Sequence, residues 1–132
     1  MITTCDIDLR LPSLNDYIRI CRGNRYEAAN IKRELEAAIS VFLRPLPRFE
    51  RPIRICFVWI ESDKRRDLDN IAFAKKFILD ALVKMGKLAD DDRRHVKGFE
   101  DRFEYGKSAK VVLYITETED DRPGGDTDRT IS

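Results

Sequence analysis

The chain has few of the residues that build disulfide frameworks, zinc sites or membrane spans. Its 132 residues include three cysteines and one histidine, and no Cys-x-x-Cys pair or Cys/His spacing typical of zinc occurs. Cys5, Cys21 and Cys56 are therefore expected to be reduced thiols of a cytoplasmic protein. No segment approaches the roughly 20 apolar residues that cross a bilayer, and no signal peptide is indicated, so no membrane partner is expected. A Gly-rich phosphate loop and a Gly-x-Ser-x-Gly motif are also missing, which argues against two common enzyme classes.

Charge, in contrast, is abundant and unevenly distributed. Charged residues make up 37% of the chain, yet the formal net charge is only +1. Residues 1–116 carry 23 basic and 18 acidic groups, a net charge of +5, whereas residues 117–132 hold six acidic and two basic groups. A basic surface on the first part is typical of proteins that bind phosphate. The acidic remainder is predicted to be a disordered tail, because it has almost nothing apolar to bury.

Hydrophobic patterning predicts the order strand, helix, strand, helix, strand, strand. Four strands are expected, over residues 2–11, 52–60, 95–105 and 109–116. Helices are expected over residues 25–42 and from Asp67 or Asp69 to Met85, with Gly86 closing the second helix. Residues 14–23 fit a loop or a short turn. This order predicts one α/β domain of the α+β type over residues 1–116, with a mixed sheet of about four strands packed with two main helices.

The most informative segment joins the second predicted strand to the second predicted helix. It reads Lys64-Arg65-Arg66-Asp67-Leu68-Asp69-Asn70, so that two carboxylates lie one residue apart behind three cations. A second acidic cluster further along the chain, Asp90-Asp91-Asp92, is followed by Arg93 and Arg94. Mg²⁺ takes hard oxygen ligands, usually one or two carboxylates together with substrate phosphate. The pattern therefore indicates a Mg²⁺-dependent phosphodiesterase whose basic residues hold a polyanion beside the metal.

Each of these residues also has a purely structural interpretation. Asp67 or Asp69 can cap the helix, the second acidic cluster can be a solvated loop, and the arginines can form a solvated face. On one continuous helix Asp69, Lys76 and Asp80 would share a face, and Lys76 could pair with Asp80 or orient a carboxylate. Capping alone does not explain a second acidic group beyond the far end of the same helix.

These motifs resemble the RusA family of Holliday junction resolvases. The resemblance rests on Asp67-Leu68-Asp69-Asn70, on Lys76 before Asp80-Ala81-Leu82, on Gly86 and Asp90-Asp91, and on Pro12-Ser13-Leu14-Asn15. It covers most of residues 7–116. It implies a homodimeric endonuclease, from bacteria or their phages, that uses Mg²⁺ or Mn²⁺ to cut four-way DNA junctions. It also implies that Asp67, Asp69 and Asp91 are catalytic metal ligands and that Lys76 is the functional lysine.

The chain departs from the family pattern between Asn70 and Lys76. Extra residues near Ala72-Phe73-Ala74 amount to about one helical turn, so Lys75 competes with Lys76 for the role of the lysine. The DNA contacts are predicted to come from Arg65, Arg66, Lys75, Arg93, Arg94 and Asn15. Two alternatives remain: a non-catalytic DNA-junction-binding protein whose acids are structural, and a metal-dependent nuclease for flaps or forks.

Overall fold

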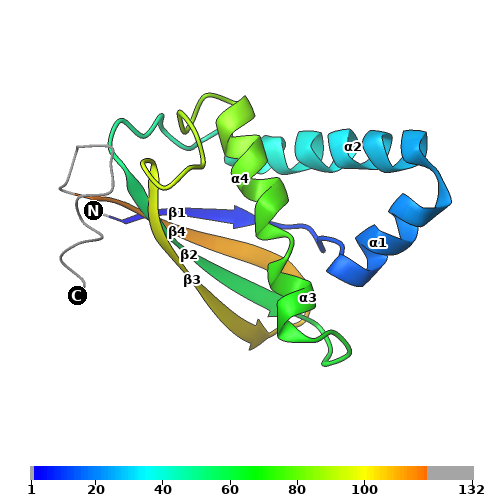
Figure 1. Ribbon diagram of the computed structural model, residues 1–132. Helices are drawn as coiled ribbons and strands as arrows, with labels where there is room; N and C mark the ends of the chain where they lie inside the picture. Colours follow the sequence, from blue (N-terminus) through cyan, green and yellow to red (C-terminus); the bar gives the residue numbers. More distant parts are fainter. Residues whose placement is uncertain (1, 119–132) are drawn as a thin grey trace, which may run out of the picture.

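Four strands form one mixed sheet in the computed structural model, which describes residues 2–118. They are β1 (Ile2–Ile7), β2 (Ile53–Glu61), β3 (Val96–Tyr105) and β4 (Lys110–Glu117). Their spatial order is β1-β4-β2-β3 (Figure 1). β4 is antiparallel to both β1 and β2, whereas β2 and β3 are parallel. The prediction of a mixed four-stranded sheet in one small α/β domain is confirmed.

The parallel pairing of β2 and β3 requires a long connection, and this connection carries the predicted site residues. β2 is nearly continuous in apolar residues, which suits a strand with a neighbour on both sides. β3 runs through Gly98 without a break. An added Cβ at Gly98 would lie 2.6 Å from Nη1 of Arg54, so the glycine gives this guanidinium room across the strand pair.

The helices are α1 (Leu14–Gly23), α2 (Arg25–Leu43), α3 (Leu68–Ala72) and α4 (Lys75–Lys84). Residues 14–23, which the sequence left open as a loop or turn, form α1. A reciprocal capping box explains its start, because Ser13 Oγ accepts from the Asp16 amide at 3.1 Å and Asp16 Oδ2 accepts from the Ser13 amide at 3.2 Å. Asn24 then caps α2 by accepting from the Tyr26 amide at 2.8 Å.

The single helix expected between Asp67 and Met85 is divided into α3 and α4, so the prediction of one continuous helix was wrong. Around Phe73 and Ala74 the backbone stays right-handed, but bonds three residues apart replace part of the α-helical ladder. The division falls next to Ala72-Phe73-Ala74. Phe73 there packs against Tyr17 and Phe77, with ring centroids 5.6 and 5.5 Å away. Gly86 follows α4 with a φ of +74°, as predicted for a residue that closes a helix.

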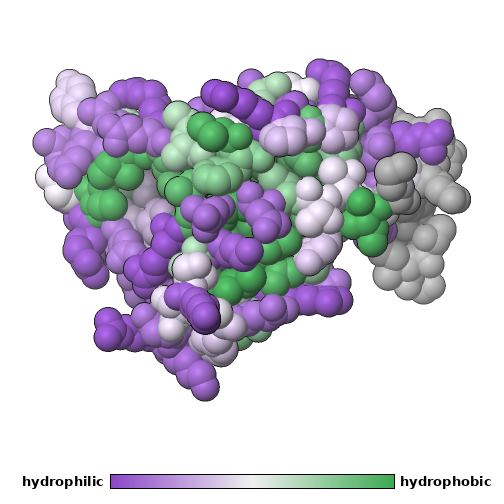
Figure 2. All heavy atoms as spheres, turned by 180° about the vertical axis from the view of Figure 1, so that it is seen from behind, coloured by the Kyte–Doolittle hydropathy of each residue, from purple (hydrophilic) through white to green (hydrophobic). Residues whose placement is uncertain are grey.

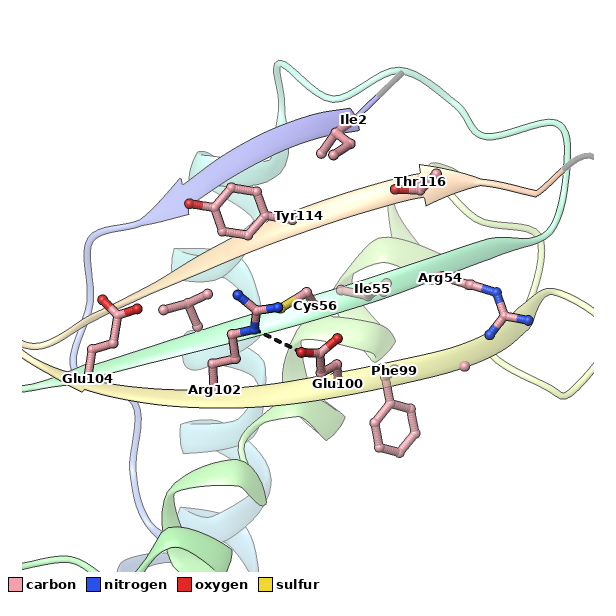
Figure 3. A pocket seen from close by; sticks show the side chains of 12 residues that line it. Ile2, Arg54, Ile55, Cys56, Phe99, Glu100, Arg102, Glu104, Tyr114 and Thr116 are labelled. Carbon is pink, nitrogen blue, oxygen red and sulfur yellow. Dashed lines mark hydrogen bonds and ion pairs between the residues drawn. The ribbon is translucent and has the colours of Figure 1, made fainter.

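The helices cover one face of the sheet and leave the other face open. The core lies between the helices and the sheet. Its largest fully buried side chains come from α2, α4, the inward positions of the strands and the loop after α4: Ile39, Leu43, Phe77, Ile78, Leu82, Ile7, Ile53, Ile55, Phe57, Trp59, Leu113 and Leu88. Seen from behind, the molecule shows hydrophobic areas interspersed with hydrophilic side chains (Figure 2). A close view of the open face shows Arg54, Arg102, Glu100 and Tyr114 over the strands, with the helices behind the sheet (Figure 3).

The C-terminal boundary lies slightly beyond the predicted one. β4 extends to Glu117, whose Oε2 accepts from the Arg51 amide at 3.1 Å, and the Thr118 amide donates to the Pro52 carbonyl at 2.7 Å. The first two residues of the predicted tail 117–132 therefore pair with the segment before β2. Residues 119–132 lie outside the described residues.

Candidate functional site

Asp67 and Asp69 lie at the N-terminus of α3, directly after the connection from β2. Asp67 is the N-cap residue by backbone position, with φ −72° and ψ 152°, but its side chain makes no capping hydrogen bond. Within residues 2–118, Asp69 Oδ1 accepts only from the amide of its neighbour Asn70, at 3.0 Å. Both carboxylates are exposed. The capping interpretation therefore does not account for Asp67, and both side chains have lone pairs available to a cation.

Arg66 fixes the chain immediately before this pair of acids. Its Nη2 lies 2.9 Å from Asp16 Oδ2, and its Nη1 donates to the Leu11 carbonyl at 2.8 Å and lies 3.7 Å from Glu61 Oε1. Only 12% of the Arg66 side chain and 10% of the Glu61 side chain are exposed. One guanidinium thus joins the end of β2 to Leu11 and Asp16, which lie on either side of the Pro12-Ser13-Leu14-Asn15 segment and are far from Arg66 in the sequence.

The tertiary structure also places Asp91 against α4. Lys76 Nζ lies 3.4 Å from Asp80 Oδ1, as the sequence predicts for residues four apart, and 3.8 Å from Asp91 Oδ2. Asp80 is further paired with Lys32 of α2 at 3.8 Å. The predicted stripe with Asp69 does not form, because Asp69 belongs to the separate helix α3. Lys76 therefore connects Asp91 to Asp80 and α4.

The three acids of the second cluster have different surroundings. Asp92 Oδ1 lies 2.6 Å from His95 Nδ1, and this hydrogen bond lowers the pKa of Asp92 below its ordinary value. Asp90 Oδ1 accepts from the Asp91 amide at 2.7 Å. Asp91 differs from both in that its Oδ2 lies 3.8 Å from Lys76 Nζ. The three acids are therefore not equivalent in the fold, and the choice of Asp91 as a metal ligand stays a prediction.

A cleft of about 460 Å³ lies beside Asp69. Its wall is mostly apolar and includes two ionisable side chains besides Asp69, namely Lys75 at the start of α4 and Asp101 of β3; the other lining residues are Leu68, Ala72, Phe73 and Phe103. Lys75 Nζ lies 2.5 Å from Asp101 Oδ2. Trp59 Nε1 donates to Asp101 Oδ1 at 2.9 Å. The structure therefore separates the two candidate lysines: Lys75 faces the cleft of Asp69, and Lys76 faces Asp91.

The sequence did not single out Asp101 as a functional residue. The signal was present in the predicted strand over 95–105, where Phe99, Asp101 and Phe103 share one parity. In the sheet these positions lie opposite Ile55, Phe57 and Trp59, which face the helices. An acid on the core-facing parity of a strand needs a partner, because burying an unpaired carboxylate is costly.

The predicted DNA contacts lie in different environments. Four of them are exposed: Arg65, Arg93, Arg94 and Asn15. Arg65 precedes Arg66 in the chain, and Asn15 precedes Asp16, whose carboxylate binds Arg66. Arg66 is largely buried, and its guanidinium is engaged inside the fold. Arg66 is therefore a poor candidate for contacting DNA, because its donors already hold Asp16 and the Leu11 carbonyl.

The donor chemistry at Asp67 and Asp69 suits a divalent cation. Exposed carboxylate oxygens are hard ligands, and Mg²⁺ commonly takes one or two of them together with phosphate and water. Within residues 2–118, however, no three acidic, histidine or cysteine side chains converge closely enough to hold a metal by themselves. The pair Asp67 and Asp69 fits the Mg²⁺ prediction, and Asp91 does not complete a three-ligand group in this arrangement.

A larger cavity of about 520 Å³ covers part of the open sheet face (Figure 3). It contains none of the predicted site residues. Among the described helices, none combines the length and hydropathy needed to cross a bilayer. Comparison with protein-family models and with curated proteins found no match.

Proposed function

We propose that the protein is a Mg²⁺-dependent endonuclease that cuts four-way DNA junctions, acting as a homodimer in the cytoplasm of a bacterial cell. The observation that carries this proposal is the Asp67-x-Asp69 pair: both carboxylates are exposed, the Asp67 side chain makes no capping hydrogen bond, and Asp69 borders a cleft that contains a lysine. The motif resemblance to the RusA family supplies the substrate. Mn²⁺ is expected to replace Mg²⁺.

Each group of residues has a defined part in this proposal. Asp67 and Asp69 would hold the metal, and Asp91 would join them when DNA is bound. When bound, the metal activates a water and neutralises charge on the phosphate. Lys76 keeps Asp91 against α4. Arg65, Lys75, Arg93, Arg94 and Asn15 contact the DNA backbone. Two such sites related by a dimer two-fold suit a junction with two-fold symmetry.

The test uses labelled four-way junction, flap and linear duplex DNA, each with Mg²⁺, Mn²⁺, Ca²⁺ or EDTA. Symmetric nicks in the junction that require Mg²⁺ or Mn²⁺ support the proposal. The variants Asp67→Asn, Asp69→Asn and Asp91→Asn should lower cleavage at least about 100-fold, since the metal contributes several kcal/mol to the transition state. Junction binding should persist or tighten, because Asn keeps the shape and removes negative charge.

Asp90→Asn is the matched control for Asp91→Asn, because both acids lie in the same loop. It should retain most of the cleavage activity. Equal losses in the two variants would remove the special role of Asp91. Faster cleavage of flaps than of four-way junctions would instead favour the nuclease for flaps or forks.

A second function is favoured by the lack of a three-ligand group within the described residues. In that case the protein binds DNA junctions without cutting them, and its acids are structural. Tight junction binding that needs no metal, together with no cleavage in Mg²⁺ or Mn²⁺, would support this alternative.

A further inference from the structure

Lys75 occupies an unusual position for a lysine that follows so closely on an exposed acidic motif. Its side chain is 17% exposed, whereas the side chain of its neighbour Lys76 is 62% exposed. Its Nζ lies 3.9 Å from the centroid of the Phe99 ring and 5.6 Å from that of Phe57. Aromatic faces attract a cation, but they do not replace the hydrogen bonds that an ammonium group makes with water.

Asp101 supplies the missing anionic partner. Its two oxygens are used in different directions, Oδ2 toward Lys75 at 2.5 Å and Oδ1 toward the Trp59 indole N–H at 2.9 Å. Trp59 is itself 2% exposed and stacks on Phe57 with ring centroids 5.6 Å apart. The carboxylate is thus held in place by the core of the sheet, and it holds the ammonium group in turn.

The result is a cation aimed at the cleft that Asp69 lines. An ammonium group has three donors; one is used by Asp101, which leaves the others for a ligand. The cleft combines this cation with apolar walls from Leu68, Phe73 and Phe103. These features fit a nucleotide unit, with a phosphate oxygen at Lys75 and the sugar or base against the apolar wall.

We propose that Asp101 is a positioning residue that holds Lys75 at the cleft, where Lys75 contacts a non-bridging phosphate oxygen next to the bond that is cut. This inference rests on the proposed function, and it assigns the phosphate-contacting lysine to Lys75. Lys76 has a different part, because it binds Asp80 and Asp91. A lysine fixed before the substrate arrives loses less freedom on binding and is already oriented for the transition state.

The first experiment measures Lys75 without relying on cleavage. Reductive methylation with formaldehyde, followed by mass spectrometry, gives the reaction rate of each lysine in the free protein. We expect Lys75 to react several times slower than Lys76 in the wild type, because the Lys75 side chain is 17% exposed and the Lys76 side chain is 62% exposed. Asp101→Asn should accelerate Lys75 severalfold, and Glu100→Gln should not, since Glu100 pairs with Arg102 on the opposite face. An unchanged Lys75 rate in Asp101→Asn would overturn the inference, even if the protein cuts no DNA.

The second experiment separates positioning from general stability. Asp101→Asn should lower the single-turnover rate constant at saturating junction DNA about 10-fold. The DNA concentration that gives half of this rate should change by a smaller factor. In the Lys75→Met background the same change should have no further effect, because residues that act through one another are not additive. Asp101→Glu should restore part of the rate. Independent losses in the double variant would show that Asp101 acts only on the fold. Should Asp101→Asn not fold, Asp101→Ser takes its place in the methylation and cleavage comparisons, and a wild-type Lys75 methylation rate in that variant would overturn the inference.

Trp59 provides a third readout, because it is the only tryptophan of the chain. Its indole donates to the carboxylate that holds Lys75. Junction DNA added in Ca²⁺ should therefore change the Trp59 fluorescence of the wild type, and the change should be reduced in Lys75→Met. Fluorescence that is identical with and without bound DNA would place the DNA away from this cleft.

Discussion

Arg66→Gln should destabilise the fold, whereas Arg65→Gln should weaken DNA binding and leave stability unchanged. The two residues are adjacent, but only Arg65 is exposed. Arg66 binds Asp16, Glu61 and the Leu11 carbonyl at once. Glutamine keeps a polar side chain of moderate length but loses the charge and the planar fork that reaches two partners.

The size of the effect follows from the groups left behind. Removing one member of a fully buried ion pair costs about 3–5 kcal/mol, because the remaining charge has no partner. Glu61 is in that position, with a buried side chain, whereas Asp16 is partly exposed and can be hydrated. The expected loss is therefore about 2–3 kcal/mol. At roughly 4 °C per kcal/mol for a domain of this size, Tm should fall by about 8–12 °C.

The assay compares urea unfolding and thermal melts of wild type, Arg65→Gln, Arg66→Gln and Arg66→Lys. Arg66→Lys should fall between wild type and Arg66→Gln, since lysine keeps the charge without the fork. Junction binding is then measured over a range of salt concentrations. On the proposed function, in which Arg65 contacts a DNA phosphate, Arg65→Gln should reduce the salt slope. An Arg66→Gln protein with wild-type stability and a reduced salt slope would refute the structural role assigned to Arg66.

Three further predictions concern the surroundings of the site. Ser13→Ala should cost about 1 kcal/mol in urea unfolding by removing the N-cap of α1, and an undiminished stability would show that the capping box contributes little. The Ser13 amide lowers the pKa of Asp16. The ionised Asp16 carboxylate therefore stabilises the fold at pH values above the ordinary aspartate pKa, and this stabilisation is lost as pH falls through the lowered pKa. In Asp16→Asn the free energy of unfolding should consequently depend less on pH in this range. Lys84→Met should cost about 1–3 kcal/mol, because Glu36 is buried, pairs with Lys84 and has an Oε2 without a hydrogen-bond partner within residues 2–118. Adding Glu36→Leu should recover that loss, and a lack of recovery would indicate that packing rather than charge is responsible.

Local patterns in the sequence were sufficient to predict most of the secondary structure. The alternation of apolar residues predicted the strands, although β1 ends at Ile7 and not at residue 11, and Gly86 marked the end of α4. Each of these features depends only on residues that are close to one another in the sequence. The pairing of Lys76 with Asp80 was predictable for the same reason, since residues four apart on a helix are always close.

The division between α3 and α4 was not predictable from periodicity, because the buried positions Ile71, Ala74 and Ile78 fit a continuous helix equally well. It accompanies the packing of Phe73 on Tyr17 of α1, a contact between segments that are distant in the chain. The same limit applies to Arg66. In the sequence it is one of three adjacent cations, and only the folded chain shows that two of them face solvent while the third is inside.

The amino-acid sequence by itself determined which residues are chemically capable of forming the site: the Asp67-x-Asp69 pair, the second acidic cluster and the lysines between them. The tertiary structure decided how these residues are arranged. It set Lys75 against Asp101 and Lys76 against Asp91, a distinction between adjacent lysines that no spacing rule contains. The physical reason is that residue type and local period are properties of the chain, whereas the partner of a charged side chain depends on which strand or loop the fold brings beside it.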